Sequence, residues 1–194
     1  MNIVIITKIL FFTSFIIWLL PPIRQFKTRF FYYFLILAII DPISLTYMYL
    51  LKTSVHPLFH IISTYFLLLA ILSKKQILTN FVALIILLVV CFLPTVIGLD
   101  TYYNFAIIVL IIIIIVTVFL KISVVDYAMD RKINLFYVII ILYNLTLILK
   151  ITGVILGFAN ATAYFIITTI FQSLIGLYFS IYREDYPRFI FKLK

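Results

Sequence analysis

The residues of this sequence that could do chemistry are mostly single polar side chains inside long apolar segments. The clearest case is "LAIIDPIS", where Asp41 and Pro42 interrupt an apolar run. An ionisable side chain in such a run is costly and often marks a pathway for a solute or a proton. The alternative is structural: a protonated or hydrogen-bonded Asp41 would hold helices together, and a kink at Pro42 would free the carbonyl of Ala38 for a hydrogen bond.

The segments that carry these residues have the composition of membrane-spanning helices. Two-thirds of the chain (66%) is apolar and 11% is charged, which is outside the range of soluble domains. A span needs about 20 apolar residues, with a lower limit of about 17. We therefore expect an all-α, polytopic membrane protein, a bundle of seven transmembrane helices. The seven segments are Ile3–Leu20, Phe30–Leu51, Pro57–Ser73, Ile77–Gly98, Phe105–Ile122, Leu135–Phe158 and Thr162–Tyr182.

The distribution of Lys and Arg predicts how these spans are oriented. Cytoplasmic connections are enriched in both residue types. The first, third and fifth connections and the C-terminal tail hold twelve of them, whereas the N-terminus and the even-numbered connections hold only Lys52. We expect the N-terminus outside and the C-terminus in the cytoplasm. The twelve are Arg24, Lys27, Arg29, Lys74, Lys75, Lys121, Arg131, Lys132, Arg183, Arg188, Lys192 and Lys194.

Depth along the predicted helices groups several polar side chains near the centre of the membrane. At about 1.5 Å per residue, Asp41 lies roughly 16 Å into its span, close to the midplane. Asn144 and Gln172 fall near the same level, and Tyr65 and Tyr143 are close to it. Polar groups in hydrocarbon face one another or a cavity. The sequence predicts a ligand or proton pathway that includes Asp41, Asn144, Gln172, Lys150 and Tyr65.

Two lysines lie within the predicted spans, nearer the outer surface. Lys150 is separated from Asp41 by about 6 Å along the membrane normal, so it could act as the counter-ion of this carboxylate. The alternative, which we favour, is that Lys150 extends outward to the lipid headgroups. Lys8 is closer to the membrane surface, and the same interpretation is favoured there.

The two histidines, His56 and His60, are four residues apart and would share one helix face. Zinc sites use such pairs but need a third and usually a fourth ligand, for which the sequence offers only Asp100 on that side. His56 and His60 are therefore weak metal candidates, and interfacial or pH-sensitive histidines are the alternatives. No metal and no cofactor is predicted.

Small residues and prolines suggest where helices pack or bend. Gly153 and Gly157 form a small-xxx-small motif that allows close approach of another helix. Pro94 predicts a second kink, in addition to that at Pro42. Kinked helices in a small bundle are compatible with a cavity or a rocking motion.

We divide the chain into a seven-span domain, 1–182, and a short basic and aromatic tail, 183–194. The tail either lies on the cytoplasmic leaflet as an anchor or docks a membrane-protein partner. The loop 123–134 is a second possible docking element. Apart from these, the expected partner is the lipid bilayer, in a prokaryotic cytoplasmic (inner) membrane.

Several functional classes are disfavoured by the sequence. The net charge of +9 is explained by the connections between spans, so nucleic-acid binding is not expected. No phosphate-binding or hydrolase motif is present, and Cys91 has no histidine at its depth. A non-enzymatic, transporter-like protein with a polar site around Asp41 is favoured. A sensor or accessory subunit acting through a partner is the alternative, and an intramembrane enzyme ranks last.

Overall fold

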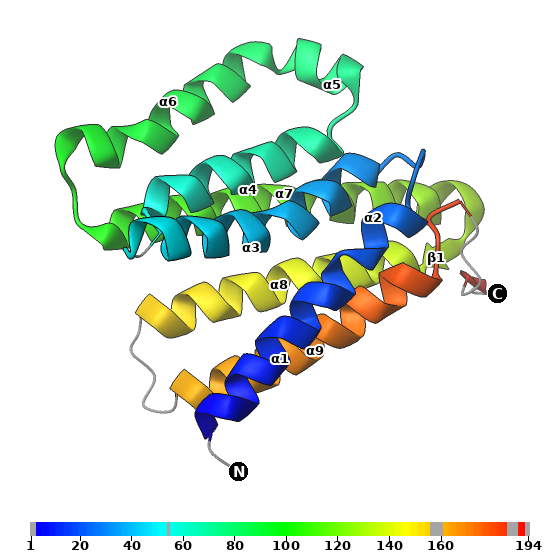
Figure 1. The fold of residues 1–194 in the computed structure, drawn as a ribbon. Coiled ribbons are helices and arrows are strands. Elements are labelled where there is room, and N and C mark those ends of the chain that lie inside the picture. Colours follow the sequence, from blue (N-terminus) through cyan, green and yellow to red (C-terminus); the bar gives the residue numbers. More distant parts are fainter. Residues whose placement is uncertain (1–2, 54, 156–160, 186–189, 193–194) are drawn as a thin grey trace.

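A computed structural model describes residues 3–53, 55–155, 161–185 and 190–192 of the chain. It is 86% helical, and its long helices run roughly side by side in an elongated bundle (Figure 1). The elements are α1 (Ile3–Trp18), α2 (Leu20–Arg24), α3 (Phe31–Leu51), α4 (Pro57–Ile71), α5 (Lys74–Thr79), α6 (Phe81–Ile97), α7 (Thr101–Asp130), β1 (Lys132–Asn134), α8 (Leu135–Ile155), α9 (Ala161–Ile181) and β2 (Ile190–Lys192).

Each of the seven predicted segments overlaps one long helix. Four spans are long and apolar enough to cross a membrane. These are Ile5–Arg24, Phe31–Leu51, Tyr102–Met129 and Leu135–Gly153. Three further apolar helices are shorter: Pro57–Ile71, Phe81–Ile97 and Ile166–Ile181. The chain is therefore a helical membrane protein. The count of seven spans and the orientation of the termini stay predictions.

Six of the long helices form a closed ring. In order around it, α1 packs against α9, α9 against α8, α8 against α7, α7 against α4, α4 against α3, and α3 against α1. Helix α6 lies outside the ring, against α4 and α7 (Figure 1). Polar side chains on the inner sides of six different helices can therefore face a common interior.

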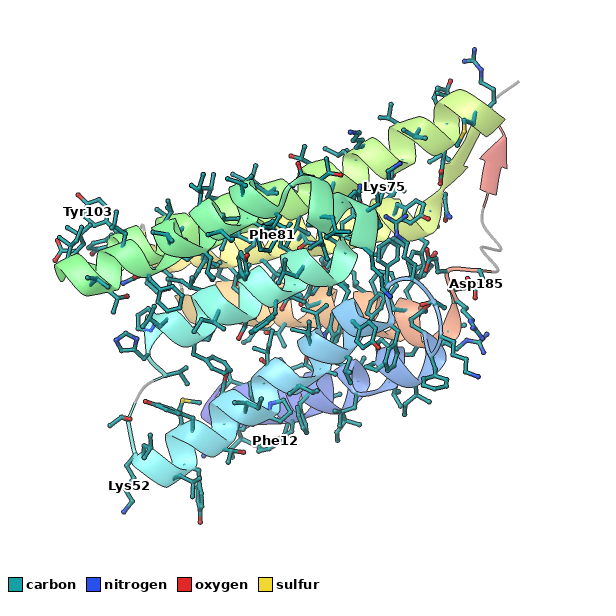
Figure 2. All side chains as sticks on the ribbon, turned by 90° about the horizontal axis from the view of Figure 1, so that it is seen from above. Phe12, Lys52, Lys75, Phe81, Tyr103 and Asp185 are labelled. Atoms are coloured by element: carbon teal, nitrogen blue, oxygen red, sulfur yellow. The ribbon has the colours of Figure 1, made fainter. Side chains whose placement is uncertain are left out.

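The two ends of the bundle carry different connections. The Lys52 end holds the connections from α3 to α4 and from α6 to α7, and the Lys75 end holds α2, α5 and the two strands (Figure 1). Figure 2 labels Lys52 and Lys75 at opposite ends of the molecule. These two names are used below to give directions along the bundle.

The interior of the Lys75 half is filled by aromatic rings. Phe34 packs against Phe179 with ring centroids 4.8 Å apart, and Phe136 against Phe179 at 5.1 Å. Phe30 and Tyr33 both contact Phe119, at 5.2 and 5.8 Å. All six side chains are at most 1% exposed. This aromatic layer, namely Phe30, Tyr33, Phe34, Phe119, Phe136 and Phe179, closes the bundle toward its Lys75 end.

The prediction that 123–134 forms a loop is wrong for most of its length. Helix α7 continues to Asp130, because the stretch "SVVDYAMD" contains no glycine or proline that would stop it. The helix ends at Arg131, which adopts a left-handed conformation with φ of 53°. Strand β1 follows and pairs antiparallel with β2, with Ile133 opposite Phe191. The end of the tail is thus paired with the connection between α7 and α8.

Close helix approach occurs at a glycine that the sequence analysis did not select. A Cβ atom at Gly176 in α9 would lie 2.9 Å from Cγ2 of Ile17 and 3.3 Å from Cε2 of Trp18, both in α1. Gly153 is buried in α8, and Gly157 lies outside the described residues. Pro94 is buried within α6, and α3 continues as a helix through Pro42.

The C-terminal end of α9 is capped by the side chain of Gln25. The last carbonyls of a helix have no partner within the helix itself. Nε2 of Gln25 donates to the carbonyls of Phe179 (3.1 Å) and Tyr182 (2.7 Å), and its Oε1 accepts from the backbone N–H of Glu184 (3.2 Å). Gln25 is completely buried. The segment after α2 is therefore fastened to the end of the last long helix.

Candidate functional site

A polar cavity of about 310 Å³ lies inside the helix ring, between the aromatic layer and the Lys52 end. All six ring helices contribute to its wall. Its volume falls at the lower end of the range for small-molecule sites, about 300–1,000 Å³. The lining residues are Phe11, Ser14, Trp18, Leu37, Ile40, Asp41, His60, Ser63, Thr64, Leu67, Ile108, Tyr143, Leu147, Lys150, Thr169 and Gln172.

Three of the five predicted pathway residues, Asp41, Lys150 and Gln172, line this cavity together. Nζ of Lys150 donates to Oε1 of Gln172 over 3.1 Å, which joins α8 to α9. Lys150 also interacts electrostatically with Asp41 on α3. Lys150 therefore faces the interior rather than extending outward to the headgroups. A cation, a carboxyl group and an amide from three helices share one space.

Tyr65 and Asn144 are not among the lining residues, and both bind other helices. The hydroxyl of Tyr65 donates to the carbonyl of Leu84 over 3.0 Å, which connects α4 to α6. Nδ2 of Asn144 donates to the hydroxyl of Tyr33 at 2.9 Å and to the carbonyl of Ile140 at 2.8 Å. Their hydrogen bonds give both side chains a role in helix packing.

Thr169 is a lining residue that the sequence analysis missed. Its side chain is 3% exposed, and within the described part of the chain its hydroxyl has no hydrogen-bond partner. Threonine hydroxyls in membrane helices usually bond back to their own helix, as Thr64 does to the carbonyl of His60. The only available signal was the position of Thr169 three residues before Gln172, on the same face of α9.

The two histidines have separate roles. Nδ1 of His56 accepts from the backbone N–H of Leu58 over 3.2 Å and so caps the start of α4. His60 lines the cavity near its Lys52 end. In the ranges that the structure describes, no three His, Cys, Asp or Glu side chains are grouped to hold a metal ion. Lys8 is exposed and lies on α1, outside the cavity.

The floor of the cavity is aromatic. Trp18 of α1 and Tyr143 of α8 pack with ring centroids 4.7 Å apart, at the side that faces the aromatic layer. The cavity thus ends in apolar rings toward the Lys75 end, whereas the Asp41 residue in its wall is exposed. Such a space can bind a small charged or polar group, and it is closed at one end in this structure.

Similarity to known proteins does not assign this site. No protein family, characterised protein or solved structure matches the chain significantly.

Proposed function

We propose that this protein is a non-enzymatic, transporter-like membrane protein that binds a small polar or charged group at Asp41. The observation that carries the proposal is the convergence of Asp41, Lys150 and Gln172 on one cavity. A charged side chain near the bilayer centre costs about 2.5–3.5 kcal/mol by insertion scales. Packing alone could be achieved with apolar residues, so the retention of two opposite charges beside an open space favours ligand binding.

In this proposal the protein has seven spans, with its N-terminus outside and its C-terminus in the cytoplasm. The Lys52 end then faces outward, and a ligand reaches the cavity from that side. The aromatic layer and the ring pair of Trp18 and Tyr143 separate the ligand from the cytoplasm. Release to the other side requires these rings to move, as in the alternating access of other transporters. The proposed location is a prokaryotic inner membrane.

Flux through reconstituted vesicles tests the proposal. The protein is placed in liposomes that contain a pH-sensitive dye, and zwitterionic, anionic and cationic solutes are supplied outside. We expect Asp41→Asn to reduce flux at least about tenfold, because a charged hydrogen bond contributes about 1.5–3 kcal/mol. Asp126→Asn is the matched control, since Asp126 is partly exposed on α7 and does not line the cavity. Equal flux of Asp41→Asn and wild type for every solute would make the carboxyl group structural.

A further inference from the structure

Helix α3 is less buried after Asp41 than before it. Its buried residues, Tyr33, Phe34, Leu37 and Ala38, all come before this position. After it, large apolar side chains are exposed, from Ile43 (47%) to Tyr49 (84%). Figure 2 shows the Lys52 end of α3 at the edge of the molecule, away from the Tyr103 end of α7. Toward the Lys52 end, the apolar side chains of α3 are therefore largely uncovered by the other described helices.

A groove lies between α1 and this outer part of α3. It has a volume of about 600 Å³ and is lined by Thr7, Lys8, Phe11 and Phe12 from α1 and by Leu45 from α3. Phe11 also lines the polar cavity. Leu45 in the groove follows Asp41 in the cavity by four residues, which is about one turn of α3. The groove and the polar cavity therefore lie next to each other, with Phe11 in the wall of both.

The surroundings of the groove determine what can occupy it. In the hydrocarbon region of a bilayer, the molecules available to fill an apolar groove are lipid chains. The polar cavity at its inner end holds a lysine and a carboxyl group, which complement a group with both charges. The buried hydroxyl of Thr169, which has no partner among the described residues, adds a hydrogen-bonding group.

We propose that the cavity binds the zwitterionic headgroup of an outer-leaflet phospholipid that enters sideways between α1 and α3. This inference rests on the proposed function of the cavity as a binding site, and it names the substrate class. The ammonium group of Lys150 faces the lipid phosphate and Asp41 faces the lipid amine. The acyl chain stays in the groove beside Phe12 and Leu45. Lys8, at the mouth of the groove, attracts the phosphate during entry.

Photo-crosslinking tests where the lipid binds. The protein is reconstituted in phosphatidylcholine vesicles that contain a trace of phosphatidylcholine with a photoreactive acyl chain, and labelled peptides are identified by mass spectrometry. We expect label on the groove segments of α1 and α3, and at least a fivefold loss in Leu45→Trp, which fills the groove. Ile85→Trp is the control, because Ile85 is 44% exposed on α6. Uniform labelling of α6 and the groove would overturn the proposal.

Competition tests the charge specificity. We expect unlabelled phosphatidylcholine to compete at least tenfold better than phosphatidylglycerol, and this preference to fall below threefold in Asp41→Asn. In Lys150→Gln we expect competition by both phospholipids to weaken at least threefold, because both carry the phosphate that Lys150 faces. Melting temperatures close to that of the wild type verify that the variants fold; if one variant unfolds, the other decides. An unchanged preference in folded Asp41→Asn, unchanged competition in folded Lys150→Gln, or equal competition by soluble phosphocholine would overturn the lipid assignment.

Crosslinking measures lipid binding and does not depend on flux. Failure of the lipid proposal can therefore be distinguished from failure of the proposed transporter-like function. Solute flux that depends on Asp41, without label in the groove, contradicts the lipid proposal alone. If neither Asp41-dependent solute flux nor label in the groove is found, the proposed function is contradicted as well.

Discussion

At the scale of single residues, Gly176 sets the distance between α1 and α9. A Cβ atom at this position would lie 2.9 Å from a side-chain atom of Ile17 and 3.3 Å from one of Trp18, so only glycine fits without a shift of its neighbours. Trp18 also forms the floor of the cavity with Tyr143. The contact of Gly176 with Trp18 therefore fixes the spacing of α1 and α9 and also the boundary of the cavity toward the Lys75 end.

We expect Gly176→Val to destabilise the fold by about 2 kcal/mol, because overpacking of a tight contact costs about 1–3 kcal/mol. Thermal melting in detergent micelles measures the effect. Ala83→Val, on an exposed face of α6, is the control and should change stability by no more than about 0.5 kcal/mol. Adding Ile17→Leu, which removes the γ2 methyl group, should restore part of the loss. Equal melting of Gly176→Val and wild type would contradict this role.

Depth along the helices placed Asp41, Lys150 and Gln172 at neighbouring levels, and the structure places all three in one cavity. Depth says nothing about rotation around the helix axis, so it could not distinguish these side chains from Asn144 and Tyr65. These two point to Tyr33 and to the carbonyl of Leu84 instead. The functional role of all five residues stays a prediction.

At the scale of elements, α9 depends on a segment that is far away in the sequence. Gln25 satisfies two carbonyls and one amide at the end of this helix, and Nε of Arg24 donates to the carbonyl of Ile181 over 3.1 Å. A buried carbonyl without a partner is costly in an apolar environment. The segment after α2 thus stabilises the helix that carries Thr169 and Gln172.

We expect Gln25→Leu to lower stability by about 2–3 kcal/mol, because it leaves buried backbone groups without partners. Thr28→Val is a milder comparison, since it removes only the bond from the threonine hydroxyl to the carbonyl of Gln25 (2.8 Å). Melting curves in the same detergent measure both. If Gln25→Leu melts no lower than Thr28→Val, the cap contributes little.

The positions of the long helices follow from apolar segment length, but their ends do not. Apolar periodicity gave no sign that α7 continues to Asp130, because the charged and polar residues after Ile122 resemble a connection. Strands β1 and β2 contain three residues each, too few for an alternating pattern to be recognised. The close contact at Gly176 had a signal, since Gly176 and Ser180 form a small-xxx-small pair like the one selected at Gly153.

At the scale of the whole molecule, the number of membrane spans depends on whether the short helices cross the bilayer. Helix α4 has 15 residues and is about 23 Å long, whereas the hydrocarbon core is about 30 Å thick. A short helix crosses only if the bilayer thins or if flanking residues extend its reach. Lys52 and Lys75 flank α4 at opposite ends of the bundle (Figure 2), so their accessibility reports whether α4 crosses.

We expect Lys52→Cys to react with a membrane-impermeant maleimide on intact cells, and Lys75→Cys to react only after permeabilisation. This result follows from seven spans with the N-terminus outside. Cys91 is 1% exposed and serves as the unreactive background in both variants. Reaction of both engineered cysteines from the same side would contradict the crossing of α4.

The packing of α1 against α9 has a consequence for how the protein is made. Contacts that join the two regions, such as those of Gln25, connect residues 154 to 159 positions apart. During translation the first helices reach the membrane long before their partner is synthesised. They must remain there while Ile17 and Trp18, which later contact Gly176, are not yet covered by α9. Closure of the ring is then a late step in biogenesis, and the cavity forms only when α9 has joined.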